Sequence, residues 1–263
     1  MAATAEGTGL GVVLDVPGPA AVGLPIIASL AVVNRGREPR VVSSRLNLIE
    51  GDVRLRVTKP DGAVVTISGA GGQPDTAYRQ ATLPPAHEIR GGMNLQADDA
   101  STFAEPGTYV LQADYLPSPR EDWVESRPVR LEMVGGTAAQ RDAAALLAKD
   151  GAGTALALGQ EGAADALRAL AARHGETPAG RLARLMLAGS AAGGAGGELD
   201  RLVADTDPET VAVWLRALST PFSGTGERLA AELASRLEKG DTAKSAARER
   251  AVRIARGLPF RSI

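Results

Sequence analysis

The chain has no cysteine among its 263 residues, and only 3% of its residues are aromatic. The absence of cysteine excludes disulfides, thiolate nucleophiles and cysteine-ligated metal sites. The scarcity of aromatic side chains means that any core must be built from Val, Leu, Ile and Ala. The hydrophobic content of 44% is normal for a globular protein and permits such a core.

The chain also lacks a strong net charge and a long apolar run. A net charge of −2 gives no overall field that favours nucleic acid or an anionic membrane. The longest apolar run, residues 24–33, is too short to cross a bilayer, so no transmembrane segment is expected. Residues 1–10 do not resemble a signal peptide. A cytoplasmic protein is expected if this is the natural start, and a cell-envelope or secreted protein otherwise.

Catalytic signatures are missing too. There are no HExxH, GxSxG or P-loop motifs, and the two histidines, His87 and His174, lie far apart in the sequence. We therefore assign no catalytic, cofactor-binding or metal-binding residue and expect a protein that is not an enzyme. The acidic stretch with Asp98, Asp99 and Glu105 leaves two alternatives to a solvated turn, a Ca²⁺ site and a carboxylate hydrolase.

The first half of the chain has the pattern of β-strands. Val53, Leu55 and Val57 alternate with polar residues, which indicates a strand with one buried face. The sequence KPDG that follows predicts a tight turn, and a long polar loop is expected at residues 69–85. Altogether about eight short strands are expected over residues 9–135, the pattern of an antiparallel sandwich.

The second half has a helical pattern. Thr137 and Gln140 form a capping-box sequence, and Asp207 followed by Pro208 predicts another helix start. Roughly six to eight helices are expected over residues 136–257. The Gly-rich residues 188–197 are predicted to form a flexible linker within this domain. Two tails, residues 1–8 and 258–263, complete the expected domain organisation.

The stretch EPGTYVLQA, residues 105–113, resembles the corner of bacterial immunoglobulin-like and fibronectin-III-like sandwiches. The resemblance implies that the Tyr109 hydroxyl bonds back to the main chain. It also implies that Leu111 takes the place of a core cysteine and that Leu95 packs beneath it. The chain departs from antibody-type domains because it has no disulfide and no Trp on the third expected strand.

Two further resemblances concern function and repeats. The stretches VVNRGREPRVV, LPPAHEI and PGTY are similar to immunoglobulin-like proteinase inhibitors, which implies inhibition through residues 69–85 or 116–128. The stretch ADALRALAARHGETPAGRLARLML resembles tetratricopeptide-like or HEAT-like helical repeats. The expected protein thus has an all-β antiparallel immunoglobulin-like sandwich followed by an all-α, repeat-like domain.

The candidate binding residues lie in two places. Trp123 sits among charged residues such as Arg120 and Asp122 in the loop 116–128, a composition typical of recognition loops. The alternative for Trp123 is a structural one, with its ring plugging the end of the sandwich or docking on the helices. Arg253 and Arg256 belong to a basic stretch that either contacts a partner or forms a solvated helix face.

The function expected from these features is binding or scaffolding of another protein, without catalysis, nucleic acid or a cofactor. A proteinase inhibitor is the alternative, and a carboxylate hydrolase is a third class. The abundance of Ala, Gly and Arg, with few Lys, indicates a GC-rich bacterial genome.

Overall fold

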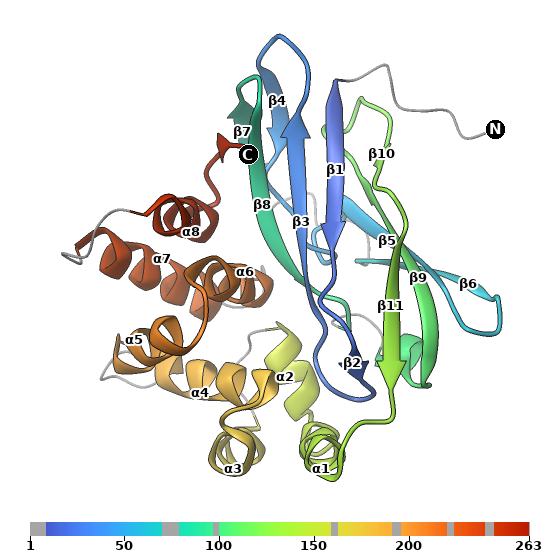
Figure 1. Cartoon of the computed structure of the whole chain (residues 1–263), viewed down its shortest axis with the longest axis vertical. Coiled ribbons are helices and arrows are strands. Elements are labelled where there is room, and N and C mark those ends of the chain that lie inside the picture. The colour runs from blue at the N-terminus through green and yellow to red at the C-terminus, as the bar shows by residue number, and fades with distance from the viewer. Residues whose placement is uncertain are drawn as a thin grey trace.

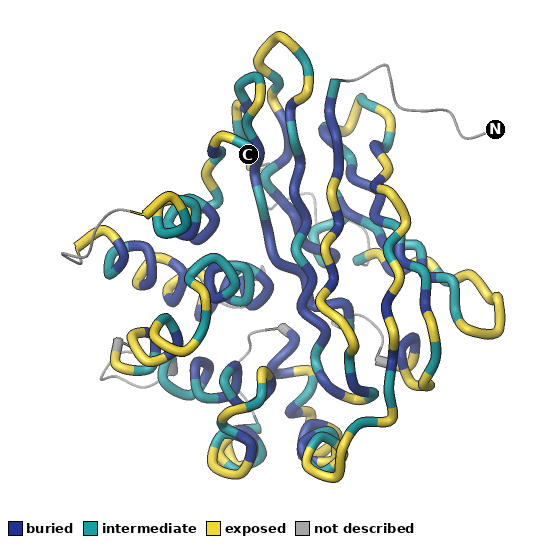
Figure 2. The backbone as a smooth tube through the Cα atoms, in the orientation of Figure 1, coloured by how far each residue is buried: buried dark blue, intermediate teal, exposed yellow. Residues whose placement is uncertain are grey.

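A computed structural model of the chain places two sheets and a layer of helices side by side (Figure 1). It describes residues 9–69, 79–96, 100–158, 163–190, 196–219, 224–239 and 245–262. The N-terminal region is rich in β-strands and the C-terminal region is helical, as the change in sequence pattern predicts. In Figure 1 the helices lie along one side and the lower end of the two sheets, and Figure 2 shows exposed residues on the turns that point away from the sheets.

The sheet next to the helices has four strands in the order β1-β3-β8-β12. All three pairings in it are antiparallel. The strands are β1 (Leu10–Asp15), β3 (Ile27–Asn34), β8 (His87–Asn94) and β12 (Phe260–Arg261).

The second sheet has the order β2-β11-β9-β5-β6, with β10 also paired to β9. Only β2 runs parallel to its neighbour, β11. The strands are β2 (Ala20–Ala21), β5 (Val53–Thr58), β6 (Val64–Ser68), β9 (Gly107–Tyr115), β10 (Val124–Glu125) and β11 (Val129–Val134). A separate ribbon pairs β4 (Arg40–Ser43) with β7 (Gln80–Leu83), and a short 3₁₀ helix spans Ala100–Phe103.

Aliphatic side chains from the two sheets form the core between them. Val53, Leu55 and Val57 are fully buried, which confirms the alternation expected for this strand. Burying each such side chain contributes about 1.5–3 kcal/mol. The Tyr109 hydroxyl donates to the Glu105 carbonyl oxygen at 2.9 Å, the backbone bond that the sequence predicted. Leu111 is fully buried in the same core.

Eight helices follow in the described part of the chain. The expected capping box is present, because the Thr137 and Gln140 side chains each bond to the other's backbone N–H. Asp207 caps another helix through the N–H groups of Glu209 and Thr210. The helices are α1 (Ala138–Leu147), α2 (Ala152–Leu158), α3 (Ala164–His174), α4 (Pro178–Ser190), α5 (Gly196–Asp205), α6 (Pro208–Leu218), α7 (Gly224–Lys239) and α8 (Ala246–Arg256).

Helix α6 packs directly on the outer face of the four-stranded sheet. A Cβ atom on Gly92 of β8 would lie 1.9 Å from the Val213 carbonyl oxygen of α6, so only glycine fits this contact. Ala21, Leu24 and Ile27 from the strand region join the hydrophobic core of the helices. The two regions therefore share a packed, apolar interface.

The structure differs from the expected segment boundaries in three places. The expected loop 69–85 contains β7, whose sequence QATL carries little strand signal. The linker expected at 188–197 is helical at both ends, since α4 continues to Ser190 and α5 starts at Gly196; residues 191–195 lie outside the described residues. The expected tail 258–263 includes β12, where Phe260 is buried and pairs with β8.

Candidate functional site

The outer face of the six-stranded sheet carries a row of polar side chains. Arg54 and Arg56 of β5 point outward because they alternate with the buried core residues of that strand. The register sets Arg54 opposite Asp114 and Arg56 opposite Gln112 on β9. Glu125 of β10 pairs with Asp114 from the other side.

Asp114 is the centre of this group. Its side chain is fully buried, and both of its carboxylate oxygens accept charged hydrogen bonds. Arg54 Nε donates to Oδ2 and Arg56 Nη2 donates to Oδ1, each at 2.8 Å. Arg56 Nη2 also lies 2.8 Å from Glu125 Oε1. The hydrogen bond to Asp114 is the main cause that raises the pKa of the Arg56 guanidinium above its usual value. A buried carboxylate held in this way fixes both arginines.

Trp123 lies against this row. The Arg54 guanidinium carbon is 4.2 Å from the centroid of the Trp123 ring, a cation–π contact. Trp123 is half-buried and immediately precedes β10, which pairs with β9 in the six-stranded sheet. Among the described residues, Trp123 belongs to neither hydrophobic core, and its ring lies against an arginine on the outer face.

The loop that carries Trp123 is tied to the sandwich. Its first backbone groups bond to other strands and loops, with the Leu116 N–H donating to the Asp52 carbonyl oxygen at 2.8 Å. Glu121 accepts from Arg40 at 2.6 Å. Arg120 and Asp122 are exposed next to Trp123, so three of the expected binding residues share one loop.

Arg253 and Arg256, the other expected binding residues, lie on α8 in the helical layer. Arg253 Nη1 donates to the Pro259 carbonyl oxygen at 3.0 Å, and its Nε lies 3.5 Å from Glu249. Arg256 pairs with Glu238 of α7 at 2.6 Å. Both arginines are therefore paired with glutamates of the same chain. They lie on the helical layer, apart from the loop that carries Trp123. A partner role for these two arginines stays a prediction.

The histidines have local roles in packing. His174 is buried, and its Nε2 lies 2.6 Å from Asp142 Oδ2, which also accepts from Arg173 at 2.5 Å. The hydrogen bond with His174 is the main cause that lowers the pKa of Asp142 below its usual value. This cluster joins α1 to α3. His87 Nδ1 lies 2.9 Å from the Pro85 carbonyl oxygen.

The acidic stretch considered for Ca²⁺ gives little to describe. Asp98 and Asp99 lie outside the described residues, and Glu105 is exposed. Among the residues that the structure describes, no group of three His, Asp or Glu side chains is arranged to hold a metal ion. Nothing in this part of the structure tests the Ca²⁺ alternative or the hydrolase alternative.

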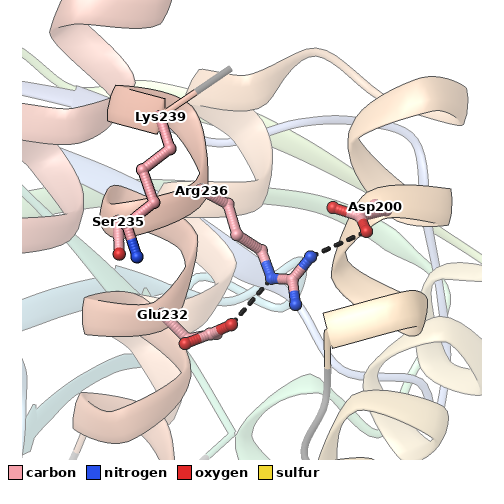
Figure 3. A pocket seen from close by; sticks show the side chains of 5 residues that line it. All are labelled: Asp200, Glu232, Ser235, Arg236 and Lys239. Atoms are coloured by element: carbon pink, nitrogen blue, oxygen red, sulfur yellow. Dashed lines mark hydrogen bonds and ion pairs between the residues drawn. The ribbon is translucent and has the colours of Figure 1, made fainter.

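A hollow of about 370 Å³ lies between α5 and α7. Figure 3 shows Arg236 reaching from α7 toward Asp200 of α5, with Glu232 on the same helix. The guanidinium is 2.7 Å from each of these two carboxylates. The lining is completed by Ser235 and Lys239. Because Arg236 is already paired with two carboxylates, we interpret the hollow as a structural contact in which ion pairs hold α5 against α7.

The sequence pattern contained part of the site on the six-stranded sheet. The alternation of Arg with Val and Leu in residues 53–58 places Arg54 and Arg56 on one face. Asp114 is 60 residues away from Arg54, and only the register of β5 with β9 brings them together. Sequence reasoning singled out Trp123 as a candidate and did not single out Arg54, Arg56 or Asp114.

Across the described residues, no helix combines the length and the apolar character that spanning a membrane requires.

Comparison with known proteins gives no family for this chain. No protein-family model matches the sequence, and no curated protein gives a match either.

Proposed function

We propose that the chain is a non-catalytic protein-binding module that contacts its partner through the outer face of the six-stranded sheet around Trp123. One observation carries this proposal: Trp123 is half-buried beside Arg54, whose side chain is 39% exposed, on the face away from the helices. Trp and Arg are enriched at the centres of protein interfaces. The helical layer covers the opposite outer face and serves as the scaffold.

We also propose that the β-rich region is an immunoglobulin-like sandwich. The orders β1-β3-β8 and β11-β9-β5-β6 correspond to the strand orders A-B-E and G-F-C-C′ of that fold. The Tyr109 bond and the buried Leu111 support the same assignment. In such domains the strand C–C′ face is a surface available for partners. The repeat-like character of the helices stays a prediction.

The test is site-specific photo-crosslinking. A benzoylphenylalanine at Thr66, which is exposed on β6 opposite Arg56, should capture a partner in a lysate of the source organism. The same group at Arg168 of α3, also exposed, is the control position and should not capture it. The captured protein is then purified and its affinity measured. Trp123→Ala should weaken binding by about tenfold or more, as expected for a central aromatic residue.

Two results would contradict the proposal. Equal capture from both positions would show that the contact is unspecific. If a Trp123→Ala protein with a normal circular dichroism spectrum keeps its affinity for the partner, the partner does not bind through the face around Trp123.

Proteinase inhibition draws no support from the loop 116–128. Its backbone and Glu121 are bound to the sandwich at several points, including the Ser43 N–H to the Pro117 carbonyl oxygen at 2.8 Å. An inhibitory loop needs an extended, accessible segment that enters a protease cleft. The other loop considered for inhibition, residues 69–85, falls largely outside the described residues.

A further inference from the structure

Arg54 has one end of its guanidinium fixed and the other end available. Its Nε is bound to Asp114 at 2.8 Å, and its guanidinium carbon lies 4.2 Å from the centre of the Trp123 ring. Its Nη1 and Nη2 have no hydrogen-bond partner within the part of the chain that the structure describes. Arg56 differs, because its Nη2 is shared between Asp114 and Glu125.

We propose that Arg54 is the anchor for a carboxylate of the partner, supplied by an Asp or Glu side chain of an acidic segment. This inference rests on the proposed function and names the chemistry that this face recognises. The two terminal nitrogens of a guanidinium form a planar fork that matches the two oxygens of a carboxylate. Such a contact adds a second carboxylate to a guanidinium that already holds one.

The surroundings of Arg54 reduce the cost of binding. A free arginine side chain loses much rotamer freedom when it is fixed in an interface. Here Asp114, which is fully buried, and the Trp123 ring already restrict the guanidinium. Binding of the partner therefore does not have to immobilise the Arg54 side chain. The free energy gained from the bidentate contact is not offset by that loss of entropy.

The local charge favours a carboxylate over a phosphate. Arg54 and Arg56 are offset by Asp114 and Glu125, so the group is close to neutral. A ligand with a single negative charge meets little repulsion from the two carboxylates. A phosphate dianion doubles both its attraction to the arginines and its repulsion from the carboxylates, so its gain at this nearly neutral group stays small, while removing it from water costs about four times as much as removing a monoanion.

The test uses the ¹⁵N-labelled chain and follows the arginine Nε–Hε and tryptophan indole signals by NMR. The probes are the peptide Ac-Gly-Ser-Glu-Glu-Glu-Ser-Gly-NH₂, the same peptide with Gln in place of Glu, and inorganic phosphate. We expect the acidic peptide to shift the signals of Arg54 and Trp123 in a saturable way. The Gln peptide and phosphate should each bind about tenfold more weakly.

Variants localise the contact. Arg54→Lys keeps the positive charge but loses the planar pair of terminal nitrogens. It should weaken binding of the acidic peptide by about fivefold or more. Arg130→Lys is the matched control on β11 of the same sheet face and should change the affinity by less than about twofold.

Three results would overturn the carboxylate assignment. They are equal binding of the Glu and Gln peptides, tighter binding of phosphate, and no shift of the Arg54 signal at millimolar peptide. The proposed function would survive any of them if crosslinking at Thr66 still captures a partner that depends on Trp123. If that capture fails as well, the outer face of the six-stranded sheet is excluded as a binding surface, and the proposed function fails with it.

Discussion

The two outer faces of the sandwich differ at the place where a helix crosses one of them. On the four-stranded sheet, Gly92 and its partner Ser29 face outward where α6 crosses, while Arg90 and Glu88 further along the same face of β8 pair with each other at 2.7 Å. On the six-stranded sheet the outward residues include the two arginines of β5. Small residues let a helix approach to backbone contact, whereas long charged side chains keep a face in contact with water. The comparison teaches that small outward residues at a single crossing point are enough for a helix to pack on a sheet face that also carries charged side chains.

The largest expected effect comes from adding one methyl group on the covered face. Gly92→Ala places a Cβ atom against the backbone of α6 at Val213, which has no flexible end that can move aside. We expect the free energy of unfolding to fall by about 3 kcal/mol. Urea denaturation followed by circular dichroism measures it. Gly135→Ala is the control, since nothing lies within 4 Å of its added Cβ, and an equal effect of both variants would break the comparison.

On the open face, the buried carboxylate should matter more than the exposed ones. Asp114→Asn keeps the shape but removes the negative charge and replaces one of the two acceptor oxygens by an NH₂ group, so one arginine loses its acceptor. Because both arginines are partly exposed and can be hydrated, we expect a loss of about 1–3 kcal/mol in unfolding free energy. Glu132→Gln, whose exposed side chain accepts from Thr108 at 2.7 Å, is the matched control. Equal stability of the two variants would argue against a central role for Asp114.

A smaller effect is expected for the stacking of Trp123 on Arg54. A double-mutant cycle with Trp123→Ala and Arg54→Ala should give a coupling energy of about 0.5–1 kcal/mol in unfolding free energy. The same cycle with Trp214→Phe and Arg54→Ala serves as control, because Trp214 belongs to the helical layer. A coupling energy near zero for Trp123 would mean that the ring is placed by its loop and not by the arginine.

The smallest effect concerns pH and the helical layer alone. The pKa of Asp142 is lowered in the folded chain, mainly by its hydrogen bond with His174. A lowered folded pKa gives stability that is present above the unfolded pKa of about 3.9 and is lost as the pH falls through the folded pKa. Asp142→Asn should therefore flatten the fall of the melting temperature below about pH 4.

The control for this pH series is Asp165→Asn, since Asp165 is 98% exposed. It should keep the slope of the unchanged protein. If both variants keep that slope, the contact between Asp142 and His174 does not contribute to the acid response.

The sequence predicted what depends on neighbouring residues. The strand at residues 53–58 and the capping box at Thr137 follow from patterns a few residues long, and the corner bond of Tyr109 was implied by the resemblance over residues 105–113; the structure confirms all three. The order of a strand-rich region and a helical region followed from the same local periodicity.

What the sequence did not predict depends on distant pairing. β7 and β12 are short and are defined by their partners β4 and β8. The sequence shows two adjacent glycines, Gly91 and Gly92, in β8. No local pattern indicates that a helix packs against the strand at this point. The candidate site has the same limit, because Trp123 was recognised as a binding candidate and its contact with Arg54 was set by the fold.

The pairing of β12 with β8 has a consequence for folding during synthesis. Ser262 and Glu88 are in contact although 174 residues separate them. At about 5–20 residues per second, a ribosome needs roughly ten to thirty seconds to add that length of chain. During this interval the first residues of β8 have a free edge that another strand can occupy. A chaperone that shields this edge would be most useful in that period, before β12 is synthesised and pairs with it.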